Sequence, residues 1–318
     1  LRDEAGLTGG GEETMKRQIF YIILSLMLAV SPLCFAEGTE PVYVENEWNF
    51  VDGGMNPDEG IPENAAGVLD RIRRNGVLRV ATEPYFAPQE FIDPALEGQE
   101  QYAGADMELA RLIAARMGVT LEIIPMDFSD VLPALTEDQA DLTISALAFT
   151  PGRAGSYTLS KGYYFAESEA STAMIIRAAD AETITAIDDL SDKVIAAQRS
   201  SLQEALAASN VRRYREFRRV SQMQEVYEAV RTGRADAGFV DMETAEEYIR
   251  NNPGAGLTLA EGIRFELEEH YKGDRIAAKK GELQLMYFVN GVIDQVLADG
   301  TYMQWFEKAR ERAEELGL

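Results

Sequence analysis

Short apolar segments alternate with amphipathic segments over most of this chain, and this alternation is what most constrains its fold. VLRVAT (77–82), TLEIIPM (120–126) and DLTISAL (141–147) are predicted strands, because each is a short run rich in apolar and β-branched residues. Apolar residues recur at helical spacing between them, at 106–117 and 128–138. Strands and helices that alternate in this way favour α/β domains with mostly parallel sheets.

The same alternation returns in the second half of the chain. Strands are predicted at 193–197, 214–220 and 237–241, and further helices at 68–74, 201–208, 222–233, 283–297 and 302–316. The two runs of strands are separated near residues 165–190, which indicates two lobes. A length of 318 residues is sufficient for one large or two medium domains.

Residues 15–36 have the pattern of a secretory signal peptide. A basic pair precedes an almost wholly apolar run at 19–30, and the small residues Cys34 and Ala36 flank the end of the segment as at a signal-peptidase site. The apolar run makes about 18 Å of helix, which is shorter than the ~30 Å hydrocarbon core of a bilayer. A signal peptide is therefore predicted, and a buried core helix is the alternative.

Cleavage of this signal predicts an exported chain, periplasmic or extracellular, that contains no cysteine. Lipid anchoring on Cys34 is disfavoured because Leu33 stands where such signals carry a small residue. Residues 1–14 are predicted to be an upstream extension, with translation starting at Met15. Residues 37–66 are acidic and rich in Gly, Pro and Asn, and are predicted to form an irregular leader.

The charge and the rare residue types exclude several classes of function. The chain has 54 acidic and 30 basic side chains, a net charge of −24 that would repel nucleic acids and anionic membranes. One cysteine and one histidine exclude a disulfide scaffold, a Cys/His zinc site and a Cys–His nucleophile. We expect no metal and no cofactor.

Seven segments from about Gly67 onward occur in the order found in one known family. They are GVLRVATEPYFAPQEF, YAGADMELARLIAARMG, PMDFSDVLPALTEDQADLTISALAFTPGR, LSKGYYF, DKVIAAQRSSLQEAL, GRADAGFVD and ADGTY. By these segments the chain resembles the bacterial extracellular solute-binding proteins of family 3, the amino-acid receptors of ABC importers. The resemblance depends on the common order, since no single segment is decisive.

The resemblance implies a fold and partners. The fold is the two-lobed α/β periplasmic-binding-protein fold of type II, with mostly parallel sheets and two crossings at the hinge. Lobe 1 would comprise residues 67–167 and 275–318, and lobe 2 residues 168–274. A monomer is expected to capture a free amino acid between closing lobes and to deliver it to a membrane permease.

A free amino acid carries a carboxylate and an ammonium, and each needs a partner once the lobes exclude water. Arg153 occupies the family position that binds the carboxylate, and the guanidinium fork matches a carboxylate bidentately. Asp241 occupies the position of the carboxylate that holds the α-ammonium. The alternatives are a solvated loop arginine, and an aspartate that only caps the next helix.

Two further pairs correspond to backbone contacts of the family. Ser200 and Ser201 match a Gly-Thr turn before a helix, whose N–H groups touch the ligand carboxylate. Ser200 replaces the usual glycine there. Ala146 and Ala148 stand where many members carry serine or threonine, so the resemblance implies that two hydroxyl donors are missing.

The remaining candidates concern the ligand side chain. Phe86 and Phe128 match the family's aromatic walls, and Tyr85 is the alternative to Phe86 because a shift of one residue would exchange them. Glu83 aligns with an acidic position that faces the distal nitrogen in members that bind basic amino acids. A basic or amide-bearing ligand is therefore preferred, and a solvated Glu83 is the alternative.

Two other functions stay open. A cyclohexadienyl-dehydratase-like enzyme on the same scaffold would need a general acid and base, which Glu83 or Glu90 could supply; His270 lies far from the cleft segments. A ligand-sensing domain is the second alternative, but such sensors carry a membrane helix and a signalling domain after this module, and the sequence ends at Leu318. We therefore expect a receptor and not an enzyme.

Overall fold

The computed structural model describes residues 49–166, 172–269 and 272–318. The predicted upstream extension, the signal peptide with Cys34, and His270 lie outside the described residues. Within the described ranges, no helix is both long and apolar enough to cross a membrane.

The first sheet has five strands in the order β5-β1-β6-β13-β7. Strands β5 and β6 pair with β1 in parallel, whereas β13 runs antiparallel to β6 and β7. The strands are β1 (Val77–Thr82), β5 (Thr120–Pro125), β6 (Leu142–Ala148), β7 (Tyr157–Leu159) and β13 (Asp274–Lys279). The chain therefore returns late to this sheet and inserts β13 between two earlier strands.

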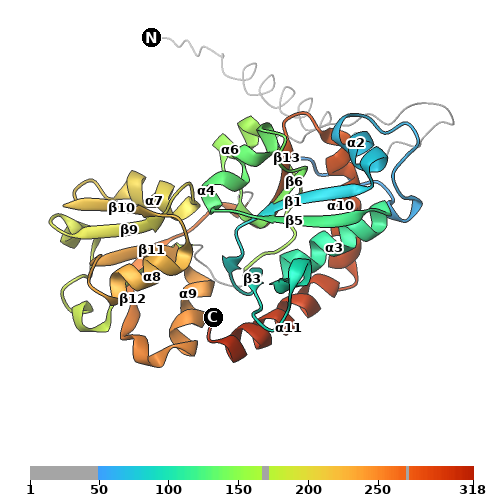
Figure 1. Ribbon diagram of the computed structural model, residues 1–318. Coiled ribbons are helices and arrows are strands. Elements are labelled where there is room, and N and C mark those ends of the chain that lie inside the picture. The colour runs from blue at the N-terminus through green and yellow to red at the C-terminus, as the bar shows by residue number, and fades with distance from the viewer. Residues whose placement is uncertain (1–48, 167–171, 270–271) are drawn as a thin grey trace, which may run out of the picture. The chain divides into compact units, whose positions relative to one another are not determined.

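Helices pack on both faces of the first sheet. One face is covered by α2 (Gly67–Asn75), α3 (Ala105–Met117), α10 (Leu283–Ala298) and α11 (Thr301–Leu316), and the other by α4 (Phe128–Val131) and α5 (Pro133–Thr136). Val80 packs on the first face and the next residue, Ala81, on the second. Successive strand residues point to opposite faces, so a strand covered on both sides needs consecutive apolar residues. The C-terminal helices, red in Figure 1, lie against α3.

The second sheet has the order β10-β9-β11-β8-β12. Its strands are β8 (Thr172–Arg177), β9 (Val194–Gln198), β10 (Glu216–Val220), β11 (Ala237–Asp241) and β12 (Leu257–Phe265). Strands β10, β9 and β11 are parallel, and β8 is antiparallel to β11 and β12. Helix α7 (Leu202–Asn210) covers one face, while α8 (Met223–Arg231) and α9 (Met242–Asn251) cover the other.

Smaller elements complete the described chain. A three-stranded sheet is formed by β2 (Tyr85–Phe86), β3 (Glu90–Ile92) and β4 (Tyr102–Ala103), and α6 (Pro151–Ser156) follows β6. The 3-10 turns are η1 (Pro57–Glu59), η2 (Gly98–Gln101), η3 (Ala178–Asp180), η4 (Ile187–Leu190) and η5 (Pro253–Ala255). Strand β3 brings Glu90 beside the first sheet, where it bears on the site below.

The predicted alternation of strands and helices is confirmed, with one helix drawn too long. The single helix predicted at 128–138 is two short helices, α4 and α5, because Pro133 has no backbone N–H to continue a helix and begins a new one. Strands β7, β8, β12 and β13 of the two five-stranded sheets were not predicted. The pattern of β12 is interrupted by Gly262, inside a shift of register between Leu259 and Arg264. The predicted lobe boundaries stay a prediction.

Part of the predicted acidic leader is packed into the first core. Val51 is fully buried, and its N–H donates to Leu159 O at 2.8 Å. Asn290 of α10 is also fully buried and donates from Nδ2 to Val51 O at 2.7 Å and to Gly53 O at 3.0 Å. From Asn49 on, the leader is thus largely irregular in conformation but held by specific hydrogen bonds.

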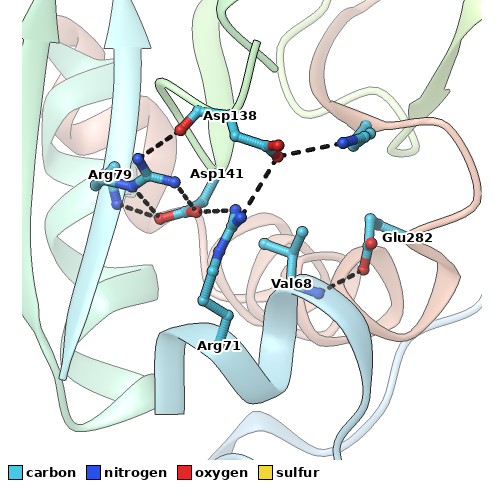
Figure 2. A network of polar contacts seen from close by, with 7 residues as sticks. Val68, Arg71, Arg79, Asp138, Asp141 and Glu282 are labelled. Atoms are coloured by element: carbon cyan, nitrogen blue, oxygen red, sulfur yellow. Dashed lines mark hydrogen bonds and ion pairs between the residues drawn. The ribbon is translucent and has the colours of Figure 1, made fainter. Parts of the chain in front are cut away.

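A polar network fixes helix α2 against the first sheet (Figure 2). The buried carboxylate of Asp141 accepts from Arg71 Nη2 at 2.7 Å and from Arg79 Nη2 at 2.8 Å. At the start of α2, the N–H of Val68 donates to Glu282 Oε2 at 2.9 Å. A helix N-terminus leaves N–H groups without partners inside the helix, and Glu282 satisfies one of them.

Replacement of Asn290 tests whether the leader contributes to stability. Asn290→Ala leaves the buried carbonyl of Val51 and the N–H of Lys161, which donates to Asn290 Oδ1 at 3.1 Å, without their partner. We expect the free energy of unfolding in urea to fall by about 2–4 kcal/mol. Asn210→Ala, at the exposed end of α7, is the control and should change it by less than about 1 kcal/mol. Equal effects of the two substitutions would contradict the structural role.

Candidate functional site

A cavity of about 120 Å³ is lined by residues that follow strands of both sheets. Seven of the predicted site residues line it: Glu83, Phe86, Phe128, Ala146, Ala148, Arg153 and Asp241. Tyr85, Ser200 and Ser201 are not among its lining residues. The segments that supply the seven are widely spaced in sequence, so the fold brings them together.

Arg153 lies near the start of the short helix α6, whose N-cap is Thr150. Its side chain is buried; Nη1 donates to Ala148 O at 2.6 Å and Nη2 to Ser200 O at 3.0 Å. The guanidinium lies over the Phe128 ring, 5.6 Å from its centroid. Burial lowers the pKa of Arg153 to about 10, so the group stays cationic at neutral pH. The cavity thus contains a fixed cation oriented by two carbonyls.

Asp241 caps the helix that follows it and also lines the cavity, while its contact with a ligand ammonium stays a prediction. It is the N-cap of α9, accepting from the Thr244 N–H at 3.0 Å through Oδ1, and it also lines the cavity. Burial raises the pKa of Asp241 to about 6, an effect that hydrogen bonds from Thr244 oppose. An ammonium group beside it would favour the ionised form.

The turn before α7 contacts Arg153 through its backbone. Ser200 adopts a left-handed conformation, φ +63°, so it keeps the backbone geometry that glycine supplies. Its N–H donates to Glu204 Oε2 at 2.6 Å, and its carbonyl accepts from Arg153. Ser201 caps α7 through its hydroxyl, which accepts from the Glu204 N–H at 3.0 Å. In this structure the turn orients Arg153 through a carbonyl, and the role of its N–H groups stays a prediction.

The structure also shows where the predicted site residues Phe86, Tyr85, Ala146 and Ala148 lie. Phe86 lines the cavity, whereas Tyr85 presents its carbonyl to Gln224 Nε2 at 2.6 Å. Ala146 has a positive φ of 42°, and its N–H donates to Asp106 Oδ2 at 3.1 Å. The backbone N–H of Ala146 is therefore used inside the protein, while Ala148 holds Arg153 through its carbonyl.

Glu83 follows β1 and is 1% exposed, so the solvated alternative is wrong for this residue. Burial raises its pKa to about 8, and a hydrogen bond with Gln198 opposes this rise. Its backbone N–H donates to Ser145 Oγ at 3.0 Å, and its Oε1 is buried with no hydrogen-bond partner among the described residues. Such an oxygen is suited to accept a hydrogen bond from a ligand.

Several lining residues were not predicted as part of a binding site. Glu90, Ser145, Tyr164, Glu243 and Asp274 all line the cavity. Glu90 was considered only as a general acid or base, and the QEF segment around it carries no local signal for a site. Asp274 begins β13, and only pairing between distant strands brings it to the cavity.

Acidic groups outnumber basic ones around the cavity. Five acidic side chains line it against the two cations Arg153 and Lys272; the acids are Glu83, Glu90, Asp241, Glu243 and Asp274. In the part of the chain that the structure describes, no three His, Cys, Asp or Glu side chains are grouped to hold a metal ion. The arrangement suits a molecule with one carboxylate and more than one cationic group.

A family model agrees with this geometry. Residues 78–310 match the model of the bacterial extracellular solute-binding proteins, family 3. The chain belongs to this family. The family assignment and the α/β fold of type II predicted from the sequence are thereby confirmed.

Individual relatives of this solute-binding protein differ in their ligands. The chain is 25% identical over 244 residues to the L-cystine-binding protein TcyJ of Escherichia coli (strain K12). The match covers 76% of this chain and 85% of the relative. A solved substrate-binding protein of an amino-acid ABC transporter from Streptococcus pneumoniae, bound to L-arginine, is 29% identical with a TM-score of 0.68, over 77% of this chain and 98% of that one.

A third likeness concerns the enzyme alternative. An ancestral amino-acid-binding protein, described as a precursor of cyclohexadienyl dehydratase, is 26% identical with a TM-score of 0.64 over 76% of this solute-binding protein and 99% of that chain. The scaffold is thus shared with the lineage of an enzyme, while the two relatives above are binding proteins.

The raised pKa of Glu83 predicts a stability that depends on pH. The folded state holds a proton on Glu83 up to about pH 8, whereas the unfolded chain loses it near about pH 4.3. The folded state binds more protons in this window, so this group lowers the stability of the ligand-free protein as pH rises, by at most about 1.4 kcal/mol per pH unit. Glu83→Gln removes this contribution.

Thermal unfolding without ligand measures the effect. The Tm of Glu83→Gln minus that of the natural protein should increase between about pH 5 and pH 8. The control Glu228→Gln removes an exposed carboxylate paired with Arg231, and should give a nearly constant difference. A constant difference for Glu83→Gln as well would show that Glu83 is ionised throughout.

Proposed function

We propose that this solute-binding protein captures a free amino acid with a cationic side chain and passes it to the permease of an ABC importer. The observation that carries the proposal is one cavity lined by a buried arginine and five acidic side chains. The arginine would receive the α-carboxylate, and the acidic groups the α-ammonium and the side-chain cation. Such a division of charge matches a basic amino acid better than an aliphatic or acidic one.

Arg153 and Asp241 would hold the backbone of the ligand. Arg153 is cationic and fixed by the carbonyls of Ala148 and Ser200. Asp241 is restrained by Thr244, so neither partner would need to be ordered on binding. Arg153 follows a strand of the first sheet and Asp241 ends a strand of the second, so a ligand that touches both would favour closure of the two predicted lobes.

Glu83 would receive the distal cation. A neutral aliphatic side chain in contact with Glu83 would leave a buried polar oxygen without a partner, whereas a cation satisfies it. Phe86 and Phe128 also line the cavity and would add attraction of about 0.5–2 kcal/mol for a cation over an aromatic face. The L-arginine of the pneumococcal relative supports this class of ligand, and the cystine of TcyJ is the counterexample.

Transport is proposed in preference to catalysis. The raised pKa of Glu83 would also suit a general acid, which is the basis of the dehydratase-like alternative. A receptor returns its ligand chemically unchanged, so mass spectrometry of an amino acid recovered after prolonged incubation separates the receptor from the enzyme.

We further propose that the protein is exported after cleavage at Ala36, without a lipid on Cys34, and that it acts as a monomer. The alternative, a ligand-sensing domain, would bind the same ligand without a permease.

Substitution of Arg153 tests the carboxylate partner. Arg153→Ala should weaken binding of L-arginine by more than about 1.5–3 kcal/mol, because the ligand carboxylate would be enclosed without its cation. Isothermal titration calorimetry measures the loss, and circular dichroism checks the fold. Arg213→Ala, at an exposed arginine away from the cavity, is the matched control and should bind as the natural protein does. Near-natural affinity in Arg153→Ala would exclude Arg153 from the site.

A thermal-shift screen of the standard amino acids and ornithine tests the ligand class. Lysine, arginine, ornithine or histidine should give the largest increase in Tm. Glu83→Gln keeps the shape of the side chain and removes its charge, so it should reduce these shifts far more than the shift with glutamine. The largest shift with leucine or glutamate, or an unchanged ranking in Glu83→Gln, would overturn the preference for basic ligands.

A further inference from the structure

Two acidic side chains on one wall of the cavity have no counter-ion among the described residues. Glu83 and Glu90 are each 1% exposed and line the same cavity. Oε1 of Glu83 and Oε2 of Glu90 are buried and have no hydrogen-bond partner within the described ranges. The hydroxyl of Ser145 links the two residues, because it accepts the Glu83 N–H at 3.0 Å and donates to Glu90 Oε1 at 3.0 Å.

A third acid, Asp106, interacts with Glu90 and accepts several hydrogen bonds from the protein. Asp106 is fully buried and accepts from Tyr163 OH at 2.7 Å, from Tyr302 OH at 2.8 Å and from the Ala146 N–H at 3.1 Å. Hydrogen bonds of this kind favour an ionised carboxylate. Burial nevertheless raises the pKa of Asp106, and the hydrogen bonds oppose that rise. The charge of the ionised Asp106 opposes ionisation of Glu90, so burial, Asp106 and Glu83 together raise the pKa of Glu90 well above its usual range.

The two cationic side chains that line the cavity make contacts with groups other than Glu83 and Glu90. Arg153 donates to two carbonyls, and Lys272 pairs with Glu269 at 2.9 Å. The other groups that influence Glu83 are Asp127, the side chain of Gln198 and the backbone of Met223. The further acids that line the cavity are Asp241, Glu243 and Asp274. Two buried carboxylates so placed would be costly, and a proton is the simplest means of neutralising one of them.

We propose that Glu90 is a second specificity-determining residue of the cavity, and that Glu83 and Glu90 exchange a proton for the side-chain cation of the ligand. The inference rests on the proposed function, since it assumes that a cationic amino acid binds. In the empty cavity the pair holds at least one proton. When the cation enters, it becomes the counter-ion of the pair and one proton leaves to the solvent. The net charge of this wall is therefore the same in both states.

This exchange has a measurable consequence for the ligand. If one proton is released on binding, the affinity for a cationic ligand rises about tenfold per pH unit over the range in which the pair titrates. A neutral side chain of similar length releases no proton from this pair. Discrimination between arginine and glutamine therefore increases with pH, and both acidic residues contribute to it.

Calorimetry in two buffers of different ionisation enthalpy measures the number of protons released. L-Arginine is titrated into the natural protein at about pH 7, in phosphate and in Tris. This pH lies above the pKa of about 6 for Asp241 and below that of about 8 for Glu83, so the α-ammonium partner contributes little. We expect release of close to one proton with arginine, and markedly less with L-glutamine.

Two variants test whether the released proton comes from Glu83 and Glu90. Glu83→Gln and Glu90→Gln should each reduce the release and flatten the dependence of arginine affinity on pH. The control is Glu228→Gln, which removes an exposed carboxylate that pairs with Arg231 and does not line the cavity. It should leave the proton release and the pH dependence of arginine affinity unchanged. The measurement on the natural protein needs no variant, so it remains informative if a variant fails to fold.

The outcomes separate this inference from the proposed function. Arginine binding without proton release, or equal release with arginine and glutamine, overturns the exchange while leaving the receptor intact. An unchanged release in a folded Glu90→Gln removes Glu90 from the pair. Failure of every amino acid to bind overturns the proposed function, and the exchange with it.

Discussion

One buried carboxylate, Asp106, connects the parts of the chain that form the cavity wall. It is fully buried at the start of α3 and takes hydrogen bonds from residues 40, 57 and 196 positions further along the chain. Through Ala146 it holds the bend in β6, and β6 in turn carries Ser145 and Ala148. Ser145 orients Glu90, and Ala148 orients Arg153. The positions of both an anionic and a cationic wall residue thus depend on Asp106.

The same arrangement determines the electrostatics of the site. Burial raises the pKa of Asp106, and three hydrogen-bond donors oppose this rise. In its ionised form Asp106 places a negative charge beside Glu90 in a medium of low dielectric. Arg153 donates to the carbonyls of Ala148 and Ser200, and its positive charge opposes the rise in the pKa of Asp274. The cavity thus contains both a cation and several acidic groups, as recognition of a zwitterion with an additional charge would require.

Much of the fold and part of the site could be predicted from the sequence. Periodicity alone gave the strand at 77–82 and the helix at 106–117, because both have strong, uninterrupted apolar patterns. Arg153 and Asp241 depended on resemblance to a family, since nothing in their local pattern separates a ligand contact from a loop arginine or a helix cap. Their roles remain predictions, although both line the cavity.

What could not be predicted depends on contacts between distant segments. Glu90 and Ser145 are 55 positions apart, and their hydrogen bond follows from the packing of β3 against the first sheet. At Ser200 the sequence suggested a turn before a helix, which the structure has, but it gave no sign that the carbonyl of this turn accepts from Arg153. The predicted contact of its N–H groups with the ligand carboxylate stays a prediction.

Two unsatisfied carboxyl groups and one strained residue line the cavity, although such features also occur elsewhere in the described chain. Ala146 has a positive φ, and Glu83 and Glu90 carry buried oxygens without hydrogen-bond partners among the described residues. Each of these features lowers the stability of the empty protein, and a fold selected for stability alone would replace them. Ala146, Glu83 and Glu90 line one cavity, where a bound cation would satisfy the carboxyl groups and return part of the lost stability through its binding free energy. For these two carboxyl groups the proposed cationic ligand would supply the missing partner, whereas apolar residues fill the two faces of the central strands in both sheets.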